Sequence, residues 1–192
     1  LPEQIGGTRN WDYRYCWLRD ATLTLLSLMD AGYVEEASAW RDWLLRAAAG
    51  APDQLQIMYG LGGERHLHEW EVPWLTGYEG SRPVRVGNAA HGQLQLDVYG
   101  EVIDALYQAR RSGLPPSEEA RRLATALVSH LCTIWHMPDE GLWEVRGGRQ
   151  HFTHSKVMAW VAMDRAVRSA EELGLAVPLD QWRRARQAIH DE

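Results

Sequence analysis

Cysteine, phenylalanine and basic charge are all scarce in this sequence of 192 residues. Its two cysteines, Cys16 and Cys132, are too few for a disulfide-rich scaffold and lack the spacing of metal ligands. Acidic residues outnumber Lys and Arg by 26 to 20, and the net charge of −6 argues against a nucleic-acid partner. No apolar run approaches the roughly 20 residues that span a bilayer, so no membrane partner is expected. Free thiols favour a reducing compartment, and we therefore expect a cytoplasmic protein.

Tryptophan is abundant where phenylalanine is scarce, with 10 residues against 1. Trp adds an N–H donor and a wide flat face, on which the apolar C–H faces of sugar rings can stack. Several of the tryptophans have helical spacing and are explained by packing between helices. Five others lie in or beside expected loops: Trp11, Trp17, Trp70, Trp74 and Trp143. This second group favours a sugar-binding protein.

Apolar periodicity predicts an all-α fold built from six helices. The expected helices cover 18–31, 34–49, 89–112, 117–137, 155–173 and 180–192. The first, third and fifth are predicted to be buried, because apolar residues lie on most of their sides. The second, fourth and sixth carry one apolar stripe each and are predicted to form the surface. Residues 142–152 are expected to form a small β-hairpin with a two-residue Gly-Gly turn.

The connections between these helices alternate in the same way. Links from a buried to a surface helix are short, whereas the opposite links, 51–87 and 138–153, are long and aromatic. Together with the N-terminal segment 6–19, these long loops are predicted to share one rim, at the N-terminal ends of the buried helices. Helical hairpins arranged in a ring have this pattern. Three hairpins do not close a ring, so the flanks are expected to expose apolar surface.

Arg19 and Asp20 stand at the start of the first buried helix, next to Tyr15 and Trp17. Charges there are costly unless they are paired or contact a ligand. An adjacent guanidinium and carboxylate can bind neighbouring sugar hydroxyls. They can equally form a buried ion pair with a helix cap, and residue spacing leaves both interpretations open.

Glu144 follows Trp143 in the loop 138–153. A carboxyl group packed on an indole is desolvated, which raises its pKa and suits a general acid. An ordinary glutamate on an exposed hairpin is the competing interpretation. The following 154–156 (His-Ser-Lys) either caps the fifth helix or supports Glu144.

Other polar groups in the long loop and after it allow weaker interpretations. His66 and His68, with glutamates nearby, are poor evidence for a metal because a fixed third ligand is missing, and no metal is expected. Arg82 either binds substrate or holds the loop together. Gln93 and Asp97 lie one helical turn apart on a buried helix, where polar groups need partners.

Six stretches of the sequence resemble glycoside hydrolase family 15, which includes glucoamylases, glucodextranases and some bacterial trehalases. They occupy 6–21, 58–64, 77–89, 93–101, 141–144 and 154–160. Among them are the strings GGTRNWDYRYCWLRDA, QLQLDVYGE and GLWE. The resemblance covers nearly the whole chain and keeps its order.

The resemblance implies an (α/α)6 barrel that hydrolyses terminal α-glucosidic bonds with inversion, without a cofactor. It implies that Glu144 is the general acid and that Arg19 and Asp20 hold glucose, with Trp17 as a wall. Trp143, Arg82 and Tyr15 complete the expected substrate contacts. Fungal relatives have a second glutamate where this sequence has Val145, so contacts beyond the cleaved bond are expected to differ.

The resemblance also implies that residues 1–192 form a partial catalytic domain, corresponding to barrel helices two to seven. The family's general base lies much later in the chain, so this part alone is expected to be inactive without the remaining half of the barrel. The leading expectation is a glucoamylase-like exo-glucosidase acting on an α-glucoside such as maltodextrin, an isomaltose-type sugar or trehalose. The alternatives are a trehalase, a non-catalytic carbohydrate-binding fragment and, more remotely, a metal-dependent hydrolase.

Overall fold

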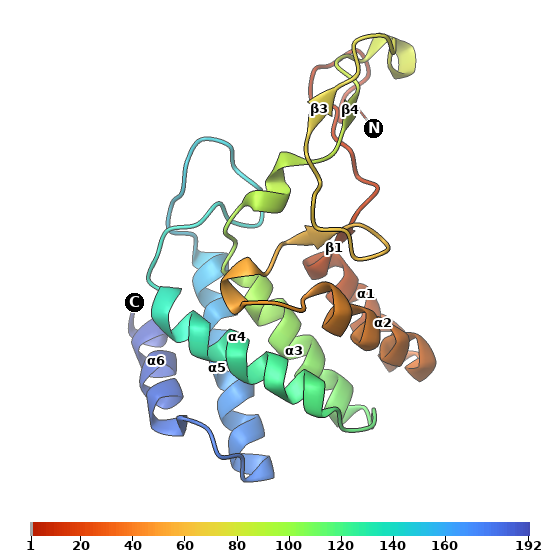
Figure 1. The fold of residues 1–192 in the computed structure, drawn as a ribbon. Coiled ribbons are helices and arrows are strands. Elements are labelled where there is room, and N and C mark those ends of the chain that lie inside the picture. Colours follow the sequence, from red (N-terminus) through yellow and green to blue (C-terminus); the bar gives the residue numbers. More distant parts are fainter. Residues whose placement is uncertain (1) are drawn as a thin grey trace.

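The computed structural model describes residues 2–192, and this part contains six α-helices and four very short strands (Figure 1). The helices are α1 (Leu18–Asp30), α2 (Val34–Ala47), α3 (Asp97–Arg111), α4 (Glu118–Ile134), α5 (Thr153–Leu173) and α6 (Leu179–Asp191). The strands are β1 (Cys16–Trp17), β2 (Met58–Tyr59), β3 (Trp70–Glu71) and β4 (Arg85–Val86). The predicted mainly helical fold is therefore confirmed.

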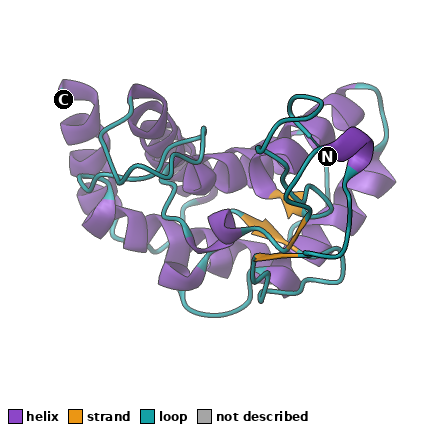
Figure 2. Ribbon diagram, turned by 90° about the horizontal axis from the view of Figure 1, so that it is seen from above, coloured by secondary structure: helices purple, strands orange, loops and turns teal. Residues whose placement is uncertain are grey.

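The helices form two layers. In the first layer α3 lies between α1 and α5, and its packing against α5 is the most extensive in the molecule. In the second layer α4 contacts both α2 and α6. Seen from above, the helices follow an arc (Figure 2). The observed order agrees with the predicted alternation of inner and outer helices, while the closed (α/α)6 barrel stays a prediction.

The close contact between α3 and α5 depends on Gly100. A Cβ atom at this position would lie 2.2 Å from the carbonyl oxygen of Met158 on α5. Around this crossing the core is filled by buried apolar side chains of α3, α4 and α5, including Val102, Leu131 and Met163. The absence of a side chain at Gly100 thus sets the spacing of the inner layer.

The inner helix α1 is less buried than its apolar sequence predicts. Its buried side includes Leu18, Leu25 and Met29, whereas Leu23 is 56% exposed. On α5, Val157 is also exposed. An inner helix is covered by neighbours on some sides only, so an apolar residue on the open side of the arc remains in solvent.

The third helix starts later than its periodicity predicts. Residues 89–92 form a short 3-10 helix, which the Asn88 side chain caps by accepting from the Ala90 N–H, and α3 begins only at Asp97. Between them, the N–H groups of Leu94 and Leu96 donate to carboxylates of the loop 138–153. Those backbone groups are therefore bound outside the helix.

The predicted hairpin at 142–152 is wrong. Residues 141–144 form a turn, in which the Glu144 N–H donates to the Gly141 carbonyl at 3.0 Å. Asp139 and Gln150 form an isolated bridge further out. The Phe152 ring lies within 2.6 Å of where a Gly141 Cβ would stand, so this glycine permits the tight turn.

Two antiparallel strand pairs fix the loops instead. β1 pairs with β2, which ties the N-terminal segment to the long loop. β3 pairs with β4, and this pair forms an arm that projects from the helical layers (Figure 1). Within residues 2–192, no helix has the length and apolar character required to cross a membrane.

Candidate active site

A cleft of about 1270 Å³ opens beside the start of α1. The N-terminal segment and the loop 138–153 supply most of its walls, as the predicted common rim requires. The long loop 51–87 contributes little to it among the described residues. The polar and aromatic residues that line it are Glu3, Arg9, Trp11, Tyr13, Tyr15, Cys16, Trp17, Arg19, Asp20, Thr24, Asn88, Trp143, Glu144 and Arg146.

Glu144 is a half-buried carboxyl group in this cleft. Its Oε1 accepts a 2.6 Å hydrogen bond from the Trp17 indole Nε1 and lies 3.9 Å from Arg19 Nη2. Burial raises the pKa of Glu144, although the Trp17 hydrogen bond and the Arg19 charge oppose this effect. The group can therefore hold a proton at higher pH than an exposed glutamate, as a general acid must.

The backbone around Glu144 is held under strain. Its φ of 53° lies in the left-handed region, which costs a residue with a side chain of order 1–3 kcal/mol. Gln93 fixes this turn, because its Nε2 donates to the carbonyls of Glu144 and Val145, both at 3.3 Å. Beyond the turn, Arg146 pairs with Glu69 at 2.9 Å.

Arg19 connects three carboxylates. Its guanidinium lies 3.7 Å from Asp20, 3.9 Å from Glu144 and 3.6 Å from Asp97, and it also contacts Gln95 at 3.4 Å. Arg19 itself is largely buried, whereas the Asp20 side chain is 72% exposed. Arg19 is thus held by internal partners, as an ion pair requires, while the exposed Asp20 faces the cleft and the N-cap residue of α1, Trp17, makes no side-chain cap hydrogen bond.

Aromatic rings form the wall beside Glu144. Trp17 contacts Tyr13 and Tyr15 with ring centroids 5.9 and 6.5 Å apart. The Tyr15 hydroxyl donates to Asp12, which also accepts from Arg14 and from the Gly87 N–H.

Asp12 was not singled out among the site residues from the sequence. Burial alone would raise the pKa of this carboxyl group, but its hydrogen bonds lower it to about 2. Asp12 connects the N-terminal segment to the end of the long loop. In the sequence, its position between Trp11 and Tyr13 is the feature that could have marked it as a buried, functional carboxylate.

Trp143 does not shield Glu144, which corrects the sequence-based interpretation. Its side chain is 81% exposed and lies at the edge of the cleft. The turn at Glu144 separates the two neighbouring side chains, and Trp17 provides the indole that contacts the carboxyl group. Tyr15, Trp17, Arg19, Asp20 and Glu144 do meet in one cleft.

Arg82 lies apart from this cleft. It follows a 3-10 turn on the projecting arm, where its Nε donates to the Thr76 carbonyl, and it is absent from the residues of the described chain that line the cleft. Arg85 connects the projecting arm to the N-terminal segment. Its guanidinium donates to the Thr8 and Asn10 carbonyls and to the Glu71 carboxylate.

A buried acid, Asp97, lies on the side of Arg19 that faces away from Glu144. Asp97 is fully buried, and neither of its carboxylate oxygens has a hydrogen-bond partner within residues 2–192. His154 Nδ1 lies 3.7 Å from Asp97, whereas the Lys156 ammonium turns away to the Trp135 carbonyl. His154 thus meets Asp97 rather than Glu144, which differs from the expected support of Glu144 by 154–156.

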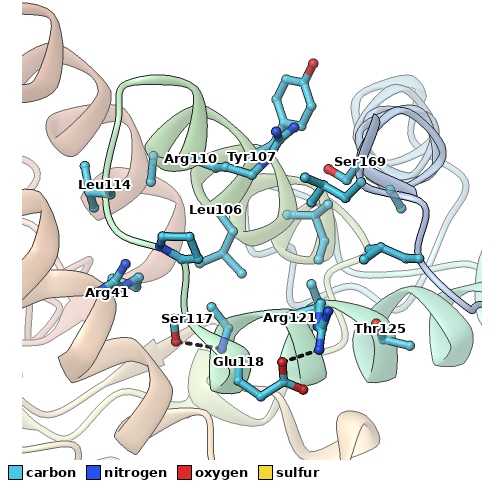
Figure 3. A pocket seen from close by; sticks show the side chains of 18 of the residues that line it. Arg41, Leu106, Tyr107, Arg110, Leu114, Ser117, Glu118, Arg121, Thr125 and Ser169 are labelled. Atoms are coloured by element: carbon cyan, nitrogen blue, oxygen red, sulfur yellow. Dashed lines mark hydrogen bonds and ion pairs between the residues drawn. The ribbon is translucent and has the colours of Figure 1, made fainter. Parts of the chain in front are cut away.

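A second cavity of about 370 Å³ lies between α3, α4, α5 and α6 (Figure 3). Its walls are mostly apolar, with Arg41, Arg110 and Arg121 among the lining residues. Its acid, Glu118, is already paired with Arg121. No second carboxyl group lines it among the described residues, so acid–base chemistry on a sugar is favoured in the first cleft. Also within residues 2–192, no group of three or more His, Cys, Asp or Glu residues is placed to hold a metal ion.

Comparison with known proteins adds independent information. Residues 1–192 match the family described as glycosyl hydrolases family 15. Over 195 residues, covering 100% of this chain and 28% of the relative, it is 43% identical to a trehalase of Mycobacterium tuberculosis. Over 192 residues, covering 98% of this chain and 29% of the relative, it is 42% identical to a trehalase of Mycolicibacterium smegmatis.

A third relative is archaeal. Over 168 residues, covering 86% of this chain and 30% of the relative, the chain is 42% identical to trehalase 1 of Sulfolobus acidocaldarius. The chain thus spans less than a third of the length of these three relatives. No solved structure matches it.

Proposed function

Because the chain belongs to glycosyl hydrolase family 15, we propose that it forms part of the catalytic domain of a trehalase. The relatives at 42–43% identity are described as trehalases, which supports trehalose over the maltodextrins expected of a glucoamylase. Trehalose joins two glucose units through a single oxygen that bridges their two anomeric carbons, both in the α configuration. Its hydrolysis needs a group that protonates the bridging oxygen and a second group that activates water.

The observation that carries this proposal is the environment of Glu144. The carboxyl group has a burial-raised pKa, an indole donor at 2.6 Å and access to a cleft of about 1270 Å³. In its protonated form Glu144 donates the proton to the bridging oxygen as the C–O bond breaks, and the leaving glucose departs with that proton. Water then attacks the opposite face of the remaining ring and inverts its configuration.

The second carboxylate of an inverting pair accepts the proton of that water. We assign it to the part of the protein that corresponds to the remaining length of the relatives. Within the cleft, the exposed edge of Asp20 accepts hydrogen bonds from glucose hydroxyls, while Arg19 is held in place by Gln95 and Asp97. Trp17 and Tyr13 offer the apolar ring faces.

The test replaces Glu144 by glutamine in the protein at its full natural length. Loss of the general acid is expected to lower kcat for trehalose by about 10²- to 10⁴-fold. The KM should stay within about twofold, because the shape of the cleft is retained. Glu36→Gln, at an exposed position on α2, is the matched control and should keep normal activity.

Glucose release is followed with trehalose and with maltose as separate substrates. Turnover of trehalose and not of maltose supports the trehalase proposal. Preferential turnover of maltose would instead support a glucoamylase. A near-normal kcat in Glu144→Gln would show that Glu144 is not the general acid.

A further inference from the structure

The Arg19 guanidinium lies between the proposed acid and a second, buried carboxylate. Its Nη2 is 3.9 Å from Glu144 Oε1, and its Nη1 is 3.6 Å from Asp97 Oδ2. Asp97 stands at the first position of α3 and is fully buried. A buried carboxylate is normally held by hydrogen bonds, yet within residues 2–192 neither oxygen of Asp97 has one. The charge of Arg19 is therefore its main compensation.

This arrangement matters for the proton on Glu144. A positive charge within about 4–6 Å of a carboxyl group favours its ionised form and lowers its pKa. That effect alone is unsuitable for a general acid, which must stay protonated at the working pH. A negative charge on the far side of the same guanidinium offsets it.

We propose that Asp97 is a positioning residue that acts through Arg19, by orienting the guanidinium and neutralising its charge so that Glu144 keeps its proton. This inference rests on the proposed function, because it concerns the same general acid. Asp97 is not among the described residues that line the cleft. It acts by setting how much positive charge Glu144 experiences.

Several neighbouring elements contribute charge to this region. The titratable and charged groups around Asp97 and Glu144 are Arg19 and Asp20 on α1, Glu101 on α3, His154 on α5, Asp139 and Arg146 in the loop 138–153, and Tyr13 in the N-terminal segment. Among these, His154 approaches Asp97 Oδ2 at 3.7 Å.

Burial raises the pKa of Asp97, and the charges of Arg19 and His154 oppose this rise. The guanidinium of Arg19, 3.6 Å away, favours the ionised form of Asp97. Replacing Asp97 by asparagine keeps the shape of the side chain and removes the charge. Apart from Glu144, Arg19 then keeps only the exposed Asp20 as a carboxylate partner, so more of its charge acts on Glu144 and the pKa of Glu144 falls.

The experiment compares pH profiles of kcat/KM for trehalose in the full-length protein. At high pH, activity falls where Glu144 loses its proton, and this part of the profile is the alkaline limb. Asp97→Asn is expected to move it to lower pH by about one pH unit, the lower end of the pKa shifts that a nearby opposite charge produces. Asp164→Asn is the matched control. Asp164 is also a buried acid, but it lies on α5 and pairs with Arg165, Arg168 and Arg186. This control should lose stability while its alkaline limb stays in place.

A second readout is independent of catalysis. The Trp17 indole is hydrogen-bonded to Glu144, so ionisation of Glu144 should change Trp17 fluorescence. The relevant signal is the pH-dependent change that is present in the native protein and absent from Glu144→Gln. In Asp97→Asn its midpoint should fall by about the same amount as the alkaline limb.

The two readouts separate the possible failures. If trehalose is not hydrolysed, the proposed function fails, and the fluorescence midpoint still tests the role of Asp97. An unmoved or raised midpoint in Asp97→Asn overturns the inference, whatever the substrate.

If Asp97→Asn does not fold, Gln95→Glu tests the same electrostatics with the opposite sign. It places a carboxylate where Gln95 Oε1 now meets Arg19 Nη1 at 3.4 Å, and the midpoint should rise. An unchanged or lowered midpoint in this variant overturns the inference equally.

Discussion

Replacing Trp17 by phenylalanine should make Glu144 a weaker acid and extend activity to higher pH. The indole N–H donates to Glu144 Oε1 at 2.6 Å, and this bond stabilises the ionised carboxylate. Phenylalanine keeps an aromatic ring beside Tyr13 and Tyr15 but has no donor. The lost hydrogen bond stabilised the ionised carboxylate more than the protonated carboxyl group. The pKa of Glu144 therefore rises further above its ordinary value.

The magnitude follows from the geometry. A hydrogen bond to a charged group contributes about 1.5–3 kcal/mol. Glu144 keeps some contact with solvent, its side chain being 23% exposed, so the lower end of that range applies. At 1.36 kcal/mol per pKa unit, the shift is about one pH unit.

The assay is the pH profile of kcat/KM for trehalose in the full-length protein. As pH rises, activity falls where the general acid loses its proton, so Trp17→Phe should move this alkaline limb upward. Trp143→Phe is the matched control, because this exposed neighbour of Glu144 should leave the limb unchanged. A limb that stays in place or moves to lower pH in Trp17→Phe would show that the indole does not stabilise ionised Glu144.

Two further predictions concern stability, measured by urea unfolding of the full-length protein. Gly100→Ala forces α3 away from α5, because its Cβ would lie 2.2 Å from a backbone oxygen, and should cost about 1–3 kcal/mol. Gly147→Ala, with nothing within 4 Å, should cost much less, and an equal loss in both variants would refute the packing argument. Burial raises the pKa of Glu101 from 4.5 to about 7, against the opposing hydrogen bond from Thr22. The folded state therefore holds the Glu101 proton more tightly, and stability falls by about 3 kcal/mol as pH rises from about 4.5 through 7. Glu101→Gln should lose this fall between about pH 4.5 and 7, and a fall of the same size in the variant would assign it to another group.

Local patterns predicted most helices well, because helix formation depends on neighbouring residues. The predicted helix over 117–137 begins where Ser117 caps α4, since its side chain accepts from the Ala120 N–H three residues later. The start of α3 was mispredicted for a non-local reason. The N–H groups of Leu94 and Leu96 donate to Glu140 and Asp139, and these carboxylates lie more than 40 residues further along the chain. Periodicity within 89–112 contains no information on such partners.

The Glu144 turn shows the same limit. Alternating residues at 142–146 are compatible with a strand, but the hydrogen bonds from Gln93 to the Glu144 and Val145 carbonyls stabilise a left-handed turn instead. The turn redirects neighbouring side chains, which is why Trp143 points to solvent. The pairing of β3 with β4 likewise places Arg82 on an arm, away from the cleft in which the family resemblance implied a substrate contact.

The sequence by itself determined the helices, the family resemblance and the main candidates, namely Glu144, Arg19 and Asp20. These depend on local spacing and on motifs that are contiguous in the chain. Only the tertiary structure decided which indole meets Glu144, because Trp17 lies 127 positions away. It alone brought Asp97 behind Arg19, where two buried helices meet. Hydrogen bonds and charge compensation act over a few ångströms of space, and the distances that set the acidity of Glu144 arise only when the helices pack.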